Sequence, residues 1–136
     1  MQSTDSPHYR LNLAQGFLTE AREDLQLARW RSCVDNCQLA VENAAKVALA
    51  LLGPVGRTHD PAKFIRKSLA SYSDAIRPQA ERMAECAEIL GPEIHARSDY
   101  GDDDSMKTPW QLFNQTDAQS ALAIAEEAVR IANEII

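Results

Sequence analysis

Apolar residues recur at spacings of three and four along almost the whole chain, and alternating apolar and polar runs are absent. This periodicity predicts an all-helical protein. The first helix is expected to begin after Ser6 and Pro7, because proline suits a first helical turn. Its apolar stripe consists of Ala14, Phe17, Leu18, Ala21, Leu25 and Ala28. We expect a second helix to start at Ser32 as its cap and to end at the Gly53-Pro54 pair.

Prolines and a capping signal delimit the remaining helices. Asp60 and Pro61 predict the start of a third helix that runs to Ile76. The fourth is expected to start at Arg77-Pro78 and to be kinked or restarted at Gly91-Pro92, since proline removes a backbone donor.

A polar loop is predicted over residues 98–116. After it, Thr116 and Gln119 have the spacing of a capping box for a last helix that reaches Ile135. Because short connections force neighbouring helices to be antiparallel, we expect an up-and-down bundle of four long helices plus a shorter fifth, forming one domain over residues 1–136. The alanine-rich faces of the second and last helices could pack within this bundle or against a second copy, so the pattern leaves a homodimer open.

The composition agrees with one soluble globular domain. The chain has 136 residues, of which 45% are hydrophobic and 25% charged. Its longest apolar run, residues 47–52, is too short to cross a membrane. The net charge of −6 disfavours non-specific binding to polyanions but leaves room for a local basic patch. Without a visible secretory signal, and with three cysteines and no Cys-x-x-Cys, the expected location is the cytoplasm.

Two groups of residues could suggest a metal, and neither has the required spacing. An EF-hand loop beginning at Asp99 would need Gly at its sixth position and Glu at its twelfth, where this chain has Asp104 and Trp110. Cys33 and Cys37 lie one helical turn apart, but the sequence offers no two further zinc ligands beside them. We therefore interpret the first group as a solvated acidic loop and the cysteines as small buried residues, and we predict no metal and no other cofactor.

The strongest candidates for ligand binding follow the kinked fourth helix. Arg97, Asp99 and Tyr100, with His95 just upstream, offer a guanidinium group, a carboxylate, a phenol and an imidazole. Arginine recognises phosphate, and a tyrosine ring can stack on a base. The predicted nucleotide- or phosphate-binding residues are Arg97, Asp99, Tyr100 and His59. A structural interpretation stays open, in which Arg97 pairs with an Asp and Tyr100 closes the end of the bundle. In the same way, His59 could simply cap the third helix.

Glu42 and Lys46 are spaced i, i+4 in the favourable order, which by itself indicates an ordinary surface pair. Together with four other segments, however, they resemble a known family, the HEPN domains. Residues 37–49 are similar to its Ala-x-Glu-x-x-x-Lys-Ala-Leu helix, with Val47 as an additional residue before Ala48-Leu49. The other similar segments are residues 21–25, 58–60, 97–102 and 116–125.

The resemblance implies a helical bundle that is commonly a homodimer and often accompanies a small nucleotidyltransferase in toxin–antitoxin pairs. Many members are ribonucleases that use an Arg followed four to six residues later by a His. This chain departs from that pattern, because no His follows Arg97. The resemblance therefore indicates a nucleotide-binding and interaction module, with Glu42, Lys46 and His95 in structural or secondary roles and no assigned catalytic residue. The alternatives are a ribonuclease in which His59 or His95 replaces the missing imidazole and a purely structural helical adaptor.

Overall fold

The structure, a computed structural model, describes residues 6–136. Over this range the chain forms seven α-helices and one short 3-10 helix, and an isolated bridge joins Asp102 to Lys107. The predicted all-helical bundle class is confirmed. None of the helices formed by residues 6–136 combines the length and the apolar character that crossing a bilayer requires.

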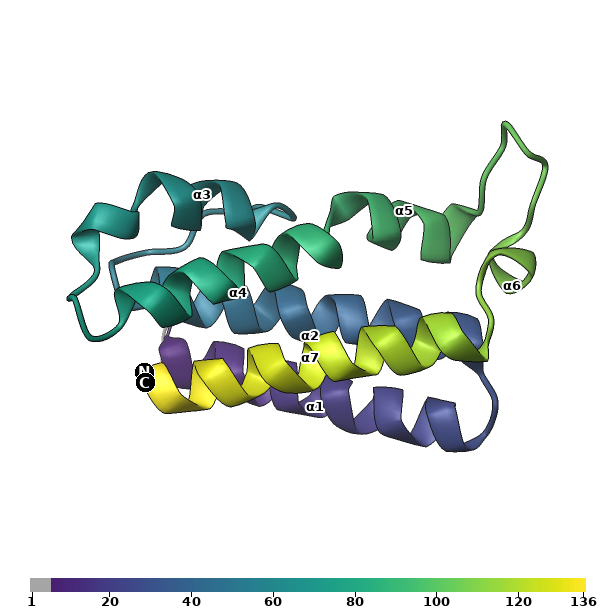
Figure 1. Cartoon of the computed structure of the whole chain (residues 1–136), viewed down its shortest axis with the longest axis horizontal. Coiled ribbons are helices and arrows are strands. Elements are labelled where there is room, and N and C mark those ends of the chain that lie inside the picture. Colours follow the sequence, from purple (N-terminus) through teal and green to yellow (C-terminus); the bar gives the residue numbers. More distant parts are fainter. Residues whose placement is uncertain (1–5) are drawn as a thin grey trace.

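Three long helices form one side of the bundle: α1 (Pro7–Gln26), α2 (Trp30–Ala50) and α7 (Gln115–Ile135). They pack against one another, and α1 begins at the end of the bundle where α7 finishes (Figure 1). Alanines allow this close packing because a small side chain lets two helix axes approach. The fully buried alanines of α2 and α7 include Ala40, Ala44, Ala48, Ala125 and Ala132. Since these faces are covered within one chain, a dimer would have to use another surface.

A second layer covers the other side of α2. It consists of α3 (Pro61–Lys67), α4 (Arg77–Ile89) and α5 (Pro92–Tyr100), which all contact α2 (Figure 1). The predicted break between α4 and α5 is confirmed at Gly91, where a Cβ atom would lie 2.9 Å from the carbonyl oxygen of Ala87. This break divides the predicted fourth helix into two separate helices.

The third helix is shorter than predicted. It ends at Lys67, and a 3-10 turn, Leu69–Ser71, follows it. The local sequence Ser71-Tyr72-Ser73-Asp74 favours turns, because short polar side chains compete for backbone hydrogen bonds. Tyr72 also donates a hydrogen bond of 2.6 Å to the carbonyl oxygen of Ala48 at the end of α2. Apolar spacing alone could not show this anchor, and the prediction of a helix up to Ile76 is wrong.

Three further boundaries differ from the prediction. The helix α5 extends to Tyr100, and α6 (Pro109–Leu112) with its own capping box lies inside the predicted loop. The capping box of α7 is formed by Asn114 and Asp117, whose side chains and backbone N–H groups bond reciprocally at 2.9 Å. Thr116 therefore lies inside the helix. The second helix starts at Trp30, before the predicted cap at Ser32.

Candidate functional site

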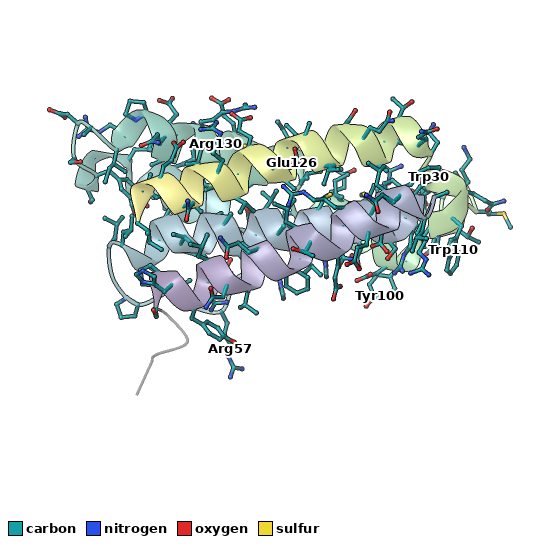
Figure 2. All side chains as sticks on the ribbon, turned by 90° about the horizontal axis from the view of Figure 1, so that it is seen from below. Trp30, Arg57, Tyr100, Trp110, Glu126 and Arg130 are labelled. Carbon is teal, nitrogen blue, oxygen red and sulfur yellow. The ribbon has the colours of Figure 1, made fainter. Side chains whose placement is uncertain are left out.

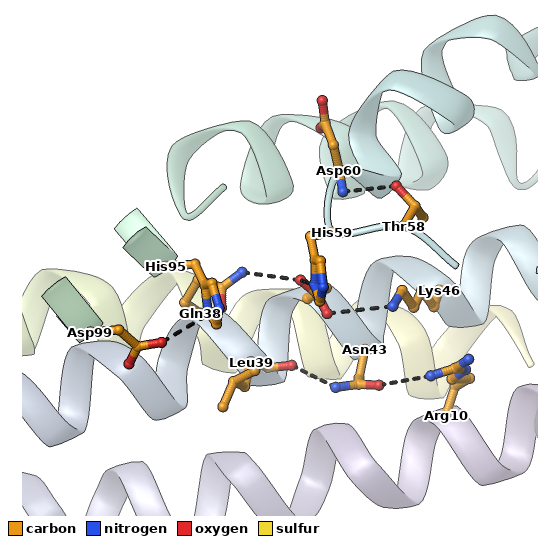
Figure 3. Close-up of polar contacts among 11 residues, drawn as sticks. Arg10, Gln38, Leu39, Asn43, Lys46, Thr58, His59, Asp60, His95 and Asp99 are labelled. Atoms are coloured by element: carbon orange, nitrogen blue, oxygen red, sulfur yellow. Dashed lines mark hydrogen bonds and ion pairs between the residues drawn. The ribbon is translucent and has the colours of Figure 1, made fainter. Parts of the chain in front are cut away.

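One face of α2 carries a polar stripe. Its residues are Asp35, Gln38, Glu42 and Lys46, and their spacings of three and four place them on the same side of the helix. Gln38, Glu42 and Lys46 are buried, with exposed fractions of 1%, 5% and 7%. Burial of such groups is costly unless they are paired. The loop of residues 55–59 supplies a partner for Glu42, α5 supplies one for Gln38, and Lys46 pairs with Glu42 within α2 (Figure 3).

Glu42 is the centre of this network. One carboxylate oxygen, Oε2, accepts a hydrogen bond from Lys46 Nζ at 3.4 Å. The other, Oε1, accepts one from Gln38 Nε2 at 3.5 Å and lies 3.2 Å from His59 Nδ1 (Figure 3). The prediction of an ordinary surface pair is wrong for Glu42 and Lys46, because tertiary contacts cover both side chains.

The two predicted histidines lie side by side although the sequence separates them widely. The rings of His59 and His95 stack with centroids 5.7 Å apart and an angle of 9° between their planes. The side chain of His59 is 74% exposed, whereas that of His95 is 31% exposed. One imidazole thus faces solvent and the other lies partly under it.

Hydrogen bonding fixes which nitrogen of His95 carries hydrogen. The carboxylate of Glu42 only accepts, so the amide NH₂ of Gln38 must point toward it, and Gln38 Oε1 is left as the acceptor. His95 Nδ1 lies 3.1 Å from that oxygen and therefore donates to it. In the neutral ring the lone pair is then on Nε2, which lies 3.5 Å from Asp99 Oδ2.

The remaining predicted site residues lie outside this network. Arg97 is half-buried on α5; the pKa of Asp102 is lowered mainly by a hydrogen bond from Ser105 and also by the positive charge of Arg97. Tyr100 is 80% exposed and lies near the end of the molecule that carries Trp110 (Figure 2). Among residues 6–136, no hydrogen bond or ring contact joins Arg97 to Tyr100. The structure therefore brings His59, His95 and Asp99 together with Glu42 and Lys46. Arg97 and Tyr100, which were predicted to bind phosphate and base together, are joined by neither kind of contact.

A pocket of about 570 Å³ opens beside His59. We call it the basic pocket, because its lining includes Arg10, Lys46 and Arg57 together with Thr58 and His59. Arg57 extends from the bundle into solvent (Figure 2). Three cationic side chains around one cavity form a local positive patch in a chain whose net charge is −6.

Sequence reasoning missed four residues of this region. Asp35 and Gln38 could have been found, because they continue the spacing of Glu42 along an otherwise apolar helix. Arg10 and Arg57 carry no such signal, since only the fold brings α1 close to the loop of residues 55–59. Arg10 is held there by a bond of 3.4 Å from its Nη1 to Asn43 Oδ1 (Figure 3).

Cys33 and Cys37 are buried, as predicted, and Cys86 is buried as well. Cys33, Cys37 and Cys86 are free thiols with exposed fractions of 0%. Burial raises the pKa of Cys86 to about 11. A protonated and covered thiol is a poor nucleophile, so Cys86 contributes to packing rather than to covalent chemistry.

Comparison with known proteins agrees with this architecture. The HEPN domain model matches residues 8–135. The chain belongs to the HEPN domain family. Among solved structures, this HEPN chain is similar to TT1696 from Thermus thermophilus, with a TM-score of 0.69, 16% sequence identity and coverage of 96% of this chain and 98% of that chain. This likeness shows a shared fold. A search of the curated proteins found no match.

Proposed function

We propose that this HEPN chain binds the phosphate groups of a nucleotide or of RNA in the basic pocket. The observation that carries the proposal is that Arg10, Lys46 and Arg57 all line one cavity. Guanidinium groups form charge-assisted, often bidentate hydrogen bonds to phosphate oxygens, and an ammonium group adds a point charge. The pocket therefore matches a phosphate-bearing ligand better than a neutral one.

The loop of residues 55–59 supports this assignment with a further donor. The backbone N–H of Asp60 donates to Thr58 Oγ1 at 2.9 Å, so the hydroxyl hydrogen of Thr58 stays available for a ligand oxygen. His59 adds an exposed ring beside the same cavity, on which a base could stack. Phosphate binding in the pocket and base stacking on His59 would together hold a nucleotide.

Titration calorimetry with ATP tests the proposal. We expect Arg57→Ala to weaken binding by about tenfold, as for the loss of one charged hydrogen bond. Arg130→Ala is the matched control, because Arg130 is an exposed arginine on the opposite side of α1 and α2 (Figure 2). An equal effect in both variants, or no binding by the wild-type chain, would contradict the proposal.

Arg97→Ala compares this pocket with the site predicted from sequence. A larger loss of ATP affinity in Arg97→Ala than in Arg57→Ala would move the phosphate site to the end of α5. We expect the opposite order, because Arg97 lines none of the pocket's described wall.

A second candidate is a ribonuclease, and the stacked histidines favour it. His59 Nδ1 lies beside the carboxylate of Glu42, and His95 Nε2 beside that of Asp99. Two imidazoles with carboxylate partners can act as base and acid on a ribose hydroxyl and a leaving oxygen. Cleavage of RNA that is lost in His59→Ala and retained in Arg130→Ala would establish this activity. Cleavage retained in both variants would point to a contaminant.

We further propose that the chain forms a homodimer. We also propose that this dimer works with a minimal nucleotidyltransferase partner, as one half of a toxin–antitoxin type pair in the cytoplasm. Exposed aromatic side chains support an interaction surface at one end of the bundle, where Tyr100 and Trp110 are 80% and 72% exposed. Light scattering of the purified chain would show a dimeric mass, and Trp110→Ser would shift it toward the monomer. A monomer that binds neither ATP nor RNA would instead favour the purely structural adaptor.

A further inference from the structure

Three potential metal ligands meet where α5 lies on α2, next to the histidine stack. One ligand atom from each of Asp35, His95 and Asp99 lies within 4.8 Å of the other two. His95 and Asp99 are spaced i, i+4 on α5, so their side chains share one face of that helix, and Asp35 approaches from α2. The three ligands therefore come from two elements and face a common point.

Each of these side chains is oriented by a neighbour that leaves one ligand atom available. His95 Nδ1 donates to Gln38 Oε1 at 3.1 Å, which leaves the lone pair on Nε2. Ser98 Oγ donates to Asp35 Oδ1 at 2.8 Å. In metal sites, histidine and carboxylate ligands are usually held by such outer hydrogen bonds.

Asp99 is held in the same way. Arg31 Nη2 donates to Asp99 Oδ1 at 3.2 Å, and Arg31 Nε donates to the carbonyl oxygen of Ser98 at 2.6 Å. These contacts direct Asp99 Oδ2 toward His95 Nε2, 3.5 Å away. Arg31 thus neutralises part of the charge of Asp99 while it fixes the position of the second oxygen.

The three available ligand atoms are all electron-pair donors. Asp35 and Asp99 each offer a carboxylate oxygen, and His95 offers Nε2, because its Nδ1 faces Gln38. A cation between these atoms would be attracted by all three groups.

We propose that Asp35, His95 and Asp99 bind a divalent transition-metal ion of the Zn²⁺ or Mn²⁺ type. An imidazole nitrogen with two carboxylates suits these ions, whereas Mg²⁺ and Ca²⁺ prefer ligand sets made only of oxygen. The side chains of His95 and Asp99 are 31% and 30% exposed, so water can complete the coordination. The ion joins α5 to α2. None of the three ligands lines the basic pocket, so metal binding can be measured without nucleotide.

Cobalt substitution tests the site on the full chain without nucleotide. We expect Co²⁺ to bind with visible d–d absorption, Zn²⁺ to displace it, and saturating Zn²⁺ to raise the Tm by about 5–10 °C. Asp35→Asn keeps the shape of the side chain and should weaken Co²⁺ binding by at least about tenfold. Asp103→Asn is the matched control, because it removes the same charge from an exposed position in the nearby loop.

His95→Gln provides a second test if Asp35→Asn does not fold, as judged by circular dichroism. Its control is His8→Gln, which removes an exposed imidazole at the start of α1. Equal Co²⁺ affinity in His95→Gln and His8→Gln would overturn the proposal. So would a thiolate charge-transfer band, which would assign the ion to cysteine. An absence of Co²⁺ and Zn²⁺ binding would likewise overturn it. The proposal that ATP binds in the basic pocket is tested by a separate experiment, so it can hold or fail whatever these results are.

Discussion

The two sides of α2 bury different kinds of side chain. The side that faces α1 and α7 is lined by alanines and valines with exposed fractions near zero. The side that faces α5 and the loop of residues 55–59 buries an amide, a carboxylate and an ammonium group. The apolar side stabilises the bundle by burying surface. The polar side needs a partner for every group, and it adjoins the basic pocket. The difference indicates that the first side stabilises the bundle, whereas the second is the side next to which we propose ligand binding.

The largest expected effect comes from breaking the buried pair on the polar side. Lys46→Met removes the ammonium group and leaves the carboxylate of Glu42 buried without it. We expect the free energy of unfolding to fall by about 3 kcal/mol. Urea denaturation of the wild type and the variant measures this change.

The double variant Glu42→Gln, Lys46→Met separates the cost of an unpaired charge from the loss of packing. Because no charge remains buried, it should be more stable than Lys46→Met alone by at least about 1 kcal/mol. A double variant less stable than the single one would show that the pair itself holds the polar side together.

On the apolar side, stability depends on how closely the helices pack. Ala125 of α7 is fully buried, and leucine there would force the helices apart. We expect Ala125→Leu to lower the free energy of unfolding by about 2 kcal/mol. Ala123→Leu, at an exposed position of the same helix, should change it by less than about 0.5 kcal/mol. Equal effects in the two variants would mean that this face is not tightly packed.

Tyr72 bonds to the backbone near the end of α2, and its substitution tests a single hydrogen bond. Tyr72→Phe loses the bond to the carbonyl oxygen of Ala48 and should cost about 1 kcal/mol at neutral pH. Burial raises the pKa of Tyr72 from 10.0 to about 12. The folded state therefore favours the protonated phenol, and this contribution to stability is present below pH 10 and lost as the pH rises to about 12.

Denaturation at a series of alkaline pH values checks the effect of this titration. Between pH 10 and 12 the wild type should lose more stability than Tyr72→Phe, which has no phenol to ionise. Parallel curves for the two proteins would contradict a raised pKa for Tyr72.

The smallest expected effect concerns the turn that joins α1 to α2. Ala28 has a φ of 58°, a left-handed conformation that favours glycine, and the N–H of Arg29 bonds to the carbonyl oxygen of Asp24 at 2.8 Å. Ala28→Gly should raise the free energy of unfolding by about 0.5–1 kcal/mol. Ala123→Gly, inside α7, should lower it by about as much. A loss of stability in both variants would argue against the left-handed turn.

The apolar side could be predicted from sequence because periodicity reports local geometry. It placed α1, α2 and α7 to within a few residues. The helix ends were less predictable, since several capping signals compete within a few positions and only packing selects one, as at Asn114 instead of Thr116.

The polar side could be predicted only in part. Glu42 and Lys46 were found through the resemblance to HEPN domains, but their burial was not predicted. The position of His59 beside Glu42 was not predicted either. Contacts such as His59 with His95, or Arg10 with Asn43, join residues that are far apart in the chain. No periodic pattern in the sequence predicts such contacts, because they depend on how α5 and the loop of residues 55–59 pack against α2.

We propose that the basic pocket, which adjoins the polar side of α2 at Lys46, is the nucleotide-binding site. The most direct measurement is NMR chemical-shift mapping of the ¹⁵N-labelled chain during a titration with ATP. We expect the largest shifts at residues 55–59 and around Arg10 and Lys46. Shifts confined to Arg97 and Tyr100, or no shifts at saturating ATP, would contradict the claim.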